Sequence, residues 1–540
     1  MSLSICFNIK TQDIENVLWD NEPLKSSIDF SILSNIKDLP AGPDFEISTM
    51  SDFSVKGFGL NFLLDTYNIK KDFDLNSIPR FDLTLVSNNG IVKPKERFIK
   101  TNHAFYNFYV GQGINRLDKN KNSSTVILPI AFVHNNANCV HNGILIFSLR
   151  DKIISKSILQ ISSETCPYLK FDLIAVLDLN TEFTHLNKIT NSSINPANEI
   201  INISNLYSDY TIEPESFADS SYFDKNNISI FGLIDNENHY SSNCETRTGQ
   251  YPLCDELLLP SYSLAKSIAG SISISLLQNK YKSITEEKVS IIPECNSSSW
   301  KDVSFENLLD MTSGHYLRTK YDYDENSTIH TTFLFEALSH KKKIEIACNS
   351  FPKKSKPGKK FVYRTSDTYI LGTGLNEFIK NKGIGNDYFT DFLIPFFDEL
   401  GFSEPIKYSL RTFDERSQPY TGWGMYLIRK DLNILSKFLH EVKNNDDYSF
   451  LNDALNPTSL NSVVAFKNAD IFYNNGFWSK KFDGEILGCK DDVWIPFMSG
   501  FGGITFALFP NGMSYYYFSD GYKYYWQNAV EASNKIKPFC

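Results

Sequence analysis

A serine and a lysine three positions apart, Ser263 and Lys266, are the residues of this sequence best suited to nucleophilic chemistry. On a helix, this spacing puts both side chains on one face. A lysine that loses its proton beside a serine hydroxyl can act as the base that makes the alkoxide. Burial promotes that loss because the charged form gives up its hydration, which lowers the pKa of the lysine. The pair therefore predicts a serine nucleophile that is activated by a lysine.

The residues that follow Lys266 are small or apolar almost all round as far as Leu277. This composition is typical of a helix buried in the middle of a domain. The same S-x-x-K spacing recurs without such a helix at Ser34/Lys37, Ser298/Lys301, Ser339/Lys342 and Ser350/Lys353. Spacing alone is therefore weak evidence, and the helix that follows singles out Ser263 and Lys266. The alternative is an ordinary helix N-terminus with an exposed lysine.

A candidate for a second proton-transfer group lies in the segment KPGKKFVYRTSDTYILGTGL (356–375). A Pro-Gly turn precedes Tyr363, a small polar loop follows it, and an apolar helix is expected from about Tyr369. A tyrosine at the mouth of such a loop can transfer a proton beside a serine–lysine pair. The alternative is a plain turn-to-helix junction with Ser366 or Asp367 as its N-cap.

A glycine-rich turn, Gly500-Phe501-Gly502-Gly503, leads into an apolar strand within FMSGFGGITFALFPNGMSYYYFSD (497–520). Glycines let the backbone come close to a ligand and present N–H groups to it. Such N–H groups can form an oxyanion hole. The alternative is a β-bulge or the entry of a hairpin.

Together, these segments resemble the serine hydrolases of the β-lactamase-related superfamily, whose motifs run S-x-x-K, Y-x-[NS] and [KH]-x-G. This group includes class C β-lactamases, D-alanyl-D-alanine carboxypeptidases, family VIII-type esterases and 6-aminohexanoate-oligomer hydrolases. Two further segments, VSFENLLDMTSGHY (303–316) and NGFWSKKF (475–482), are similar to family features. The resemblance covers about residues 225–540. It implies a C-terminal β-lactamase/transpeptidase-like domain with an antiparallel sheet, flanking helices and a helical subdomain.

The resemblance also implies a role for each motif residue. Ser263 would be the acylated nucleophile, Lys266 would assist its deprotonation, and Tyr363 would carry the proton to the leaving group and activate water. The backbone N–H groups of Ser263 and Phe501 would hold the oxyanion. Gly500, Thr365 and Ser499 are the remaining candidates for oxyanion or substrate binding.

Two motif positions depart from the family pattern. Thr365 stands where asparagine or serine is usual, although its hydroxyl can still donate and accept a hydrogen bond. The third motif reads Met498-Ser499-Gly500, without the usual lysine or histidine. In β-lactamases and D-Ala-D-Ala peptidases that cation lies near the substrate carboxylate. Its absence favours the esterase or 6-aminohexanoate-oligomer-hydrolase branch.

Length and charge limit the other classes of function. The chain has 540 residues, a net charge of −10 and 42% hydrophobic residues, which predicts a globular protein of several domains. The acidic balance argues against non-specific nucleic-acid binding. No apolar run approaches the ~20 residues of a membrane helix, and the first residues lack the pattern of a secretory signal. We expect a cytoplasmic protein without a membrane span.

Nine cysteines are scattered along the chain without a C-x-x-C pair, so we expect reduced, buried thiols rather than a disulfide framework. The segment HNNANCVH (134–141) contains His134, Cys139 and His141, which could ligate a metal. Two histidines and a cysteine in a loop more often occur by chance, and no fourth ligand is evident. We therefore expect no metal and no organic cofactor.

Alternating apolar and polar residues over the first ~200 positions predict strands, as at Phe81, Leu83 and Leu85. This pattern is typical of a β-sandwich or barrel. We expect a boundary near 205–215 in the polar stretch 187–220, which separates a mostly-β N-terminal domain (1–210) of unknown role from a hydrolase domain (211–540). Strands at both ends of the second part, with helices between them, predict an α+β fold.

These observations predict a serine hydrolase that cleaves an ester or amide bond of a small-molecule substrate through an acyl-enzyme on Ser263. One alternative is a catalytically inactive binding or sensing protein with the same fold, favoured by the departures at Thr365 and Met498. Another is a β-lactamase or D-amino-acid peptidase. The aromatic and acidic stretch 315–325 is expected either to line the substrate mouth or to form a solvated loop. The oligomeric state is left open.

Overall fold

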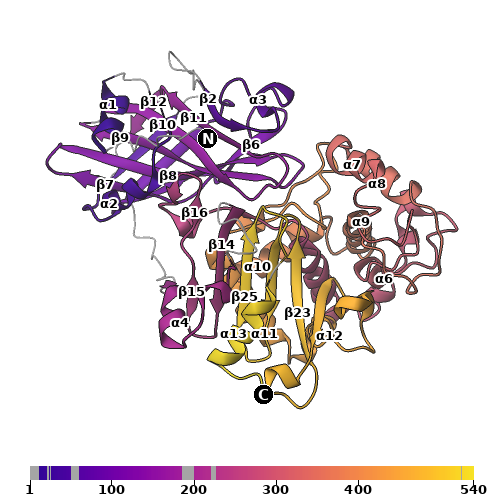
Figure 1. Cartoon of the computed structure of the whole chain (residues 1–540). Helices are drawn as coiled ribbons and strands as arrows, with labels where there is room; N and C mark the ends of the chain where they lie inside the picture. The colour runs from indigo at the N-terminus through magenta and orange to yellow at the C-terminus, as the bar shows by residue number, and fades with distance from the viewer. Residues whose placement is uncertain are drawn as a thin grey trace.

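Two large sheets follow one another along the chain, with the helices gathered around the second (Figure 1). The computed structural model describes residues 11–540 apart from 21–23, 25, 50–59, 152, 185–199, 220–226 and 525. This arrangement is the predicted α+β fold, with a mostly-β N-terminal part and antiparallel strands with helices in the C-terminal part.

The first sheet has twelve strands, and all of its pairings are antiparallel. Its strands are β1 (Phe45–Thr49), β2 (Asn61–Asp65), β3 (Leu83–Asn88), β4 (Ile91–Pro94), β5 (Phe98–Ile99), β6 (Tyr106–Val110), β7 (Gly113–Asp118), β8 (Ser123–His134), β9 (Val140–Arg150), β10 (Ile153–Glu164), β11 (Phe171–Leu177) and β12 (Thr181–Thr184). The main path runs β12-β1-β3-β4-β7-β8-β9-β10-β11-β2, and β6 with its partner β5 joins at β8. In the described residues this path does not close through strand pairing. Buried residues of β1, β3 and β4 nevertheless share one hydrophobic cluster with residues of β8, β9, β10 and β11, so the two ends of the path face each other across a core.

Residue alternation explains why these strands form. In β3, every second residue is buried, and the Asn89-Gly90 turn that follows adopts positive φ angles of 51° and 74°. Asparagine and glycine tolerate this left-handed conformation, which tight hairpins require. By contrast, β8 and β9 are buried along almost their whole length. They therefore lie in the middle of the molecule rather than at its surface.

The second sheet has nine strands in the order β13-β15-β14-β25-β24-β23-β22-β21-β20. They are β13 (Ile200–Asn202), β14 (Ile228–Ile234), β15 (His239–Ser241), β20 (Val463–Phe466), β21 (Ile471–Asn474), β22 (Phe477–Phe482), β23 (Val493–Gly500), β24 (Ile504–Leu508) and β25 (Ser514–Ser519). Every pairing is antiparallel except that of β13 with β15. The first and the last strand of the C-terminal half, β13 and β25, thus belong to the same sheet.

Most helices lie between β15 and β20 or at the end of the chain. They are the π-helix Lys266–Ser271, α5 (Ile272–Lys280), α6 (Phe305–Leu309), α7 (Thr328–Thr331), α8 (His340–Asn349), α9 (Thr365–Asn381), α10 (Ile394–Glu399), α11 (Arg429–Val442), α12 (Ser449–Leu455) and α13 (Gln527–Ile536). Three further helices, α1 (Thr11–Trp19), α2 (Ser34–Lys37) and α3 (Ile69–Asp72), accompany the first sheet, and α4 (Ser204–Asp209) follows β13. Two short strands, β18 (Leu259–Pro260) and β19 (Tyr426–Leu427), pair with each other beside the buried helix that begins after Ser263.

The last strand of the first sheet, β12, ends at Thr184, and the first strand of the second sheet, β13, begins at Ile200. Residues 185–199, which include much of the polar stretch 187–220, lie outside the described residues. Because β13 already belongs to the second sheet, this change of partner comes before the domain boundary that we predict at 205–215. One hydrophobic core nevertheless runs through both parts, from Ile14 to Phe518.

Eight of the nine cysteines are paired, so the expectation of reduced thiols is wrong. The disulfides are Cys139–Cys166, Cys244–Cys254, Cys295–Cys348 and Cys489–Cys540. The partners are 10 to 53 residues apart in sequence, and only folding brings them together. The ninth cysteine, Cys6, lies outside the described residues. Among the described residues, no helix combines the length and apolar character needed to cross a bilayer.

Candidate active site

Ser263 and Lys266 come together at the start of the buried helix, as their spacing predicts. Lys266 Nζ donates a hydrogen bond to Ser263 Oγ over 2.8 Å. The lysine side chain is only 1% exposed, whereas Ser263 is partly exposed. A buried base beside an accessible hydroxyl is the arrangement that a serine nucleophile needs.

Besides Ser263, Lys266 donates hydrogen bonds to two residues from distant segments. Its Nζ donates to Thr365 Oγ1 over 3.2 Å and to the backbone carbonyl of Gly422 over 3.1 Å. Three acceptors around one ammonium group fix its position at Ser263. Thr365, the first residue of α9, therefore contacts the lysine through its hydroxyl, whereas its predicted part in substrate or oxyanion binding stays a prediction.

Burial lowers the pKa of Lys266 to about 8, and the negative charge of Glu325 opposes this shift. At neutral pH, a useful fraction of the amine is therefore unprotonated, which would not be so at its ordinary value of 10.5. When Lys266 is neutral, the Ser263 hydroxyl can donate to its nitrogen and lose its proton to it.

Glu325 is a site residue that the motifs did not identify. Its carboxylate accepts from the Thr365 hydroxyl over 2.6 Å and from the Thr365 backbone N–H over 2.7 Å. His330 Nδ1 lies 3.4 Å from the same carboxylate. The Thr365 hydroxyl thus donates to Glu325 and accepts from Lys266, which links the acid to the lysine. The only sequence signal was that Glu325 ends the acidic stretch 315–325.

Tyr363 completes the cluster from just before α9. Lys266 Nζ lies 5.0 Å from the centre of the Tyr363 ring, and Trp478 stacks on that ring with centroids 5.4 Å apart. Burial raises the pKa of Tyr363 well above 10, although a hydrogen bond with Ser263 opposes the shift. The phenol therefore stays protonated at neutral pH, so the unprotonated fraction of Lys266 is the available base, and Tyr363 can act by passing protons to and from it.

Close packing explains the small residues on the buried helix. Ser267 Oγ donates to the carbonyl of Gly476 over 2.7 Å, and Ser271 Oγ donates to the carbonyl of Asn475 over 2.5 Å. Gly476 has a φ of 85°, and a Cβ there would stand 2.3 Å from Ser271 Oγ. The NGFW turn between β21 and β22 is thereby fixed to the helix that carries Lys266.

The glycine-rich turn lies beside the nucleophile segment. Gly500 ends β23, and a Cβ there would meet the carbonyl of Ser261 at 3.0 Å. The Phe501 side chain is exposed by 42%, and its ring lies 6.0 Å from that of Tyr262, which precedes Ser263. Ser499 is partly exposed on β23. These contacts support the predicted proximity, while the roles of the backbone N–H groups stay predictions.

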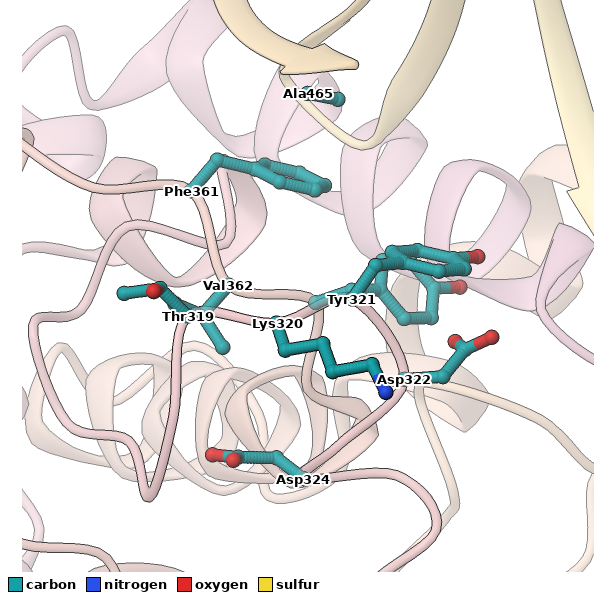
Figure 2. Close-up of a pocket in the computed structure, with 9 residues that line it drawn as sticks. Thr319, Lys320, Tyr321, Asp322, Asp324, Phe361, Val362 and Ala465 are labelled. Atoms are coloured by element: carbon teal, nitrogen blue, oxygen red, sulfur yellow. The ribbon is translucent and has the colours of Figure 1, made fainter.

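A small pocket opens beside Tyr363 (Figure 2). It is lined by Thr319, Lys320, Tyr321, Asp322, Asp324, Phe361, Val362, Tyr363 and Ala465. Burial and the charge of Glu325 raise the pKa of Asp322 to about 6. Five of the lining residues belong to the stretch 315–325, which we expected either at the substrate mouth or in a solvated loop. The stretch thus lies beside Tyr363, and its place at the substrate mouth stays a prediction.

In segment 134–141, Cys139 and His141 lie close to Cys166, while two of the three candidate metal ligands already have partners within the protein. Cys139 is bonded to Cys166, and His134 Nδ1 accepts hydrogen bonds from the backbone N–H groups of Asn136 and Ala137 over 3.1 and 3.0 Å. The Cys139 sulfur is thus in a disulfide, and His134 Nδ1 already accepts hydrogen bonds from the backbone. His141 is buried nearby.

No protein-family model and no curated protein matches the sequence. Among solved structures, the chain is similar to a class C β-lactamase, with 16% identity over 62% of this chain and 95% of the other and a TM-score of 0.43. It is similar to EstCE1, a hydrolase with promiscuous acyltransferase activity, with 12% identity over 62% and 98% and a TM-score of 0.44. It is also similar to a β-lactamase/D-alanine carboxypeptidase from Pseudomonas syringae, with 11% identity over 62% and 98% and a TM-score of 0.42. These are proteins of the classes that the motifs resemble.

Proposed function

We propose that this protein is a serine hydrolase that cleaves an ester or amide bond through an acyl-enzyme on Ser263. The observation that carries the proposal is the 2.8 Å contact between Lys266 Nζ and Ser263 Oγ, made by a buried lysine whose pKa is lowered to about 8. A lysine held in this way is an effective base near neutral pH.

The reaction begins when neutral Lys266 accepts the Ser263 proton and Ser263 Oγ attacks the substrate carbonyl carbon. The tetrahedral intermediate that forms carries a negative oxygen, which the backbone N–H groups of Ser263 and Phe501 would stabilise. As the carbonyl re-forms, the bond to the leaving group breaks, and the leaving alkoxide or amine takes a proton from Tyr363. Lys266 then returns the proton to Tyr363. This leaves an ester between the acyl group and Ser263.

Deacylation follows the same path with water in place of Ser263. Water attacks the acyl carbon while Tyr363 accepts the water proton and passes its own proton to neutral Lys266. The bond to Ser263 Oγ then breaks, the serine regains its proton, and the carboxylic acid leaves. No step requires a metal or an organic cofactor, because side chains and backbone N–H groups supply every proton and charge.

We propose that the substrates lack a carboxylate near β23. That strand, VWIPFMSG, contains no lysine, arginine or histidine, and Met498 is buried in the core at 1% exposure. The pocket beside Tyr363 is instead lined by Asp322 and Asp324 as well as Lys320. Turnover of simple esters or amides is therefore expected to exceed turnover of β-lactams or D-amino-acid peptides.

Intact-mass spectrometry after treatment with a fluorophosphonate probe tests the proposal. The wild type should gain one probe, and Ser263→Ala should gain none. Ser298→Ala is a matched control, because Ser298 and Lys301 have the same spacing but are exposed; it should label like the wild type. A folded wild type that stays unlabelled would contradict the proposal and leave a catalytically inactive binding or sensing protein. Among labelled proteins, p-nitrophenyl esters, short amides and nitrocefin would separate the substrate classes.

We also propose that the protein works in an oxidising compartment rather than in the cytoplasm. Four disulfides within the described residues support this proposal, since disulfides persist mainly in oxidising surroundings. Alkylation without reduction should add at most one group, at Cys6, and alkylation after reduction should add nine. Equal numbers in both experiments would overturn the proposal.

A further inference from the structure

The turn between β8 and β9 reaches out of the first sheet into the hydrolase part of the chain. We call residues Asn135–Cys139 the hairpin turn. All five are buried, although loops usually lie at the surface. Its residues bond mainly to segments that hold Ser263 and Lys266, some 125 to 290 positions further along the chain.

Asn138 makes the central contacts of the hairpin turn. Its side-chain oxygen accepts from the backbone N–H of Tyr262 over 2.8 Å and from that of Gly424 over 2.9 Å. Its side-chain nitrogen donates to the carbonyl of Met425 over 3.2 Å. Ser261 Oγ lies 3.3 Å from the same oxygen. One buried amide thus satisfies backbone groups of two separate segments.

One of these segments leads directly to Ser263, and the other contacts Lys266. Tyr262 directly precedes Ser263 and has a φ of 41°, a left-handed conformation that a residue with a bulky side chain rarely adopts. Gly424 follows two residues after Gly422, whose carbonyl accepts a hydrogen bond from Lys266. Asn138 therefore fixes the backbone immediately before the nucleophile and close to the acceptor that holds the lysine.

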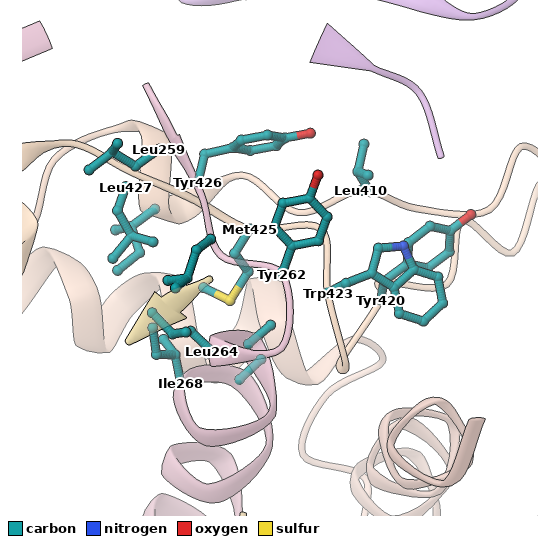
Figure 3. Packing of buried hydrophobic residues seen from close by; sticks show 14 of the residues in the cluster. Leu259, Tyr262, Leu264, Ile268, Leu410, Tyr420, Trp423, Met425, Tyr426 and Leu427 are labelled. Carbon is teal, nitrogen blue, oxygen red and sulfur yellow. The ribbon is translucent and has the colours of Figure 1, made fainter. Parts of the chain in front are cut away.

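The surroundings make this arrangement rigid. The Ser261 N–H donates to the Met425 carbonyl over 2.9 Å, and Figure 3 shows Tyr262 and Met425 packed in one hydrophobic cluster with Trp423. Trp423 Nε1 donates to the carbonyl of Asn136 over 3.0 Å. A second residue of the hairpin turn thus supports the same segment.

Asparagine suits position 138 for its backbone as well as for its side chain. Asn138 has a φ of 57° and an exposure of 0%. Asparagine and glycine tolerate this left-handed region better than other residues. Glycine at this position would therefore keep the conformation of the hairpin turn while removing the amide.

We propose that Asn138 is a positioning residue of the hydrolase site: through Tyr262 and Gly424 it sets the place of Ser263 relative to Lys266. This inference rests on the function proposed above and gives the first sheet a role in it. The N-terminal part supplies a piece of the active-site framework, so the hydrolase part does not hold its nucleophile in place without it. Asn138 touches neither the substrate nor the reacting atoms, and acts on them through the backbone.

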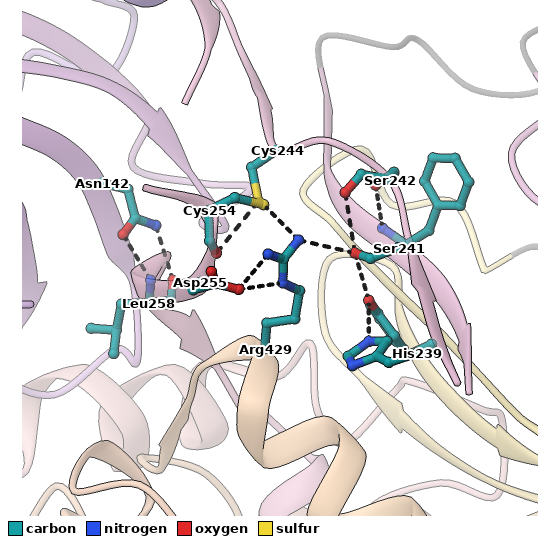
Figure 4. The surroundings of a disulfide bond; sticks show 11 residues. Asn142, His239, Ser241, Ser242, Cys244, Cys254, Asp255, Leu258 and Arg429 are labelled. Atoms are coloured by element: carbon teal, nitrogen blue, oxygen red, sulfur yellow. Dashed lines mark hydrogen bonds and ion pairs between the residues drawn. A yellow bond between two sulfur atoms is a disulfide. The ribbon is translucent and has the colours of Figure 1, made fainter. Parts of the chain in front are cut away.

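The test compares Asn138→Gly with Asn142→Ala in the full-length protein. Asn142, on β9, also bridges the two parts of the molecule: it donates to the carbonyl of Leu258 over 2.9 Å and accepts from its N–H over 3.1 Å (Figure 4). Both variants thus remove a buried amide between the same two parts, but Leu258 lies five residues before Ser263. The rate of covalent labelling by a fluorophosphonate, the concentration for half-maximal labelling rate, and Tm are measured for each.

We expect Asn138→Gly to lower the maximal labelling rate at least tenfold, with little change in the half-saturating concentration, because the attack geometry is impaired and not the binding of the probe. Asn142→Ala should lower the rate less than threefold. Asn138→Asp, which keeps an oxygen acceptor for Tyr262 and Gly424, should recover part of the rate.

Two results would overturn the inference. One is a labelling rate for Asn138→Gly within twofold of the wild type, and the other is an equal loss in Asn138→Gly and Asn142→Ala at equal Tm. If Asn138→Gly does not fold, Asn138→Asp takes its place: it loses the bond to Met425 and should label more slowly than Asn142→Ala, and an equal rate would contradict the inference. An unlabelled wild type would instead contradict the proposed function, so the two failures are distinguishable.

Discussion

Ser263 and Lys266 share their three-residue spacing with Ser339 and Lys342, yet the two pairs lie in opposite environments. Lys266 is 1% exposed and donates to three oxygens. The Lys342 side chain is 56% exposed and lies 3.7 Å from Glu345 on the surface of α8, while the Ser339 hydroxyl caps that helix. Spacing brings the two side chains near each other, but burial decides whether the lysine can lose its proton at neutral pH.

Replacement of the buried lysine should have the largest effect of the changes considered below. Lys266→Met keeps the apolar length of the side chain and removes the base, so we expect the rate of ester hydrolysis to fall by about 10²–10⁴. Steady-state kinetics with a p-nitrophenyl ester measures this loss. Lys342→Met at the exposed pair is the matched control. Equal activities of the two variants would show that burial does not distinguish the pairs.

Loss of the threonine hydroxyl should have an intermediate effect. Thr365→Val has nearly the same shape but cannot accept from Lys266 or donate to Glu325. A hydrogen bond to a charged group is worth about 1.5–3 kcal/mol, which corresponds to a fall in kcat of roughly 10–10². Thr365→Ser keeps the hydroxyl and should stay within a few fold of the wild type. A fully active Thr365→Val would remove this residue from the site.

The pH dependence of activity should report the buried lysine directly. Because Lys266 must be neutral to act as the base and burial lowers its pKa to about 8, activity should rise with pH through a midpoint near that value. The Glu325 carboxylate raises the pKa of Lys266. Glu325→Gln removes this charge, so the midpoint should move to lower pH. A midpoint that moves to higher pH, or not at all, would contradict the electrostatic effect of Glu325 on Lys266.

The exposed pair should affect stability and not activity. Ser339→Ala removes the N-cap of α8, where Ser339 Oγ accepts from the backbone N–H of Lys342 over 3.3 Å. Loss of such a cap costs about 1 kcal/mol of stability, which urea denaturation measures. The rate of ester hydrolysis should be unchanged. A clear loss of activity in this variant would weaken the contrast between the pairs.

Much of the fold was predictable from short-range patterns. The β3 hairpin, the long apolar strands β8 and β9, and the final strands β24 and β25 follow from alternation, apolar runs and turn residues. The helix after Ser263 follows from its apolar and small residues. These signals act between near neighbours in the chain, where the side-chain periods of strands and helices can be recognised directly.

Contacts between distant segments could not be predicted in this way. Cys139 and Cys166 were expected to be reduced, and the segment around Cys139 drew notice only as a poor metal site. Its actual partners, Tyr262 and Gly424, lie more than 120 residues further along the chain. Glu325 likewise contacts Thr365 from a loop 40 residues earlier. No pattern of spacing indicates such pairs.

The sequence by itself therefore determined which side chains could react: a serine and a lysine on one helical face, and a tyrosine before a second helix. It did so because local spacing fixes which residues share a face. Only the tertiary structure decided how reactive they are. The pKa of Lys266 depends on the residues that bury it. In our proposal, the position of Ser263 depends on Asn138, from the turn between two strands of the first sheet. Both are set by packing between segments that are far apart in the chain.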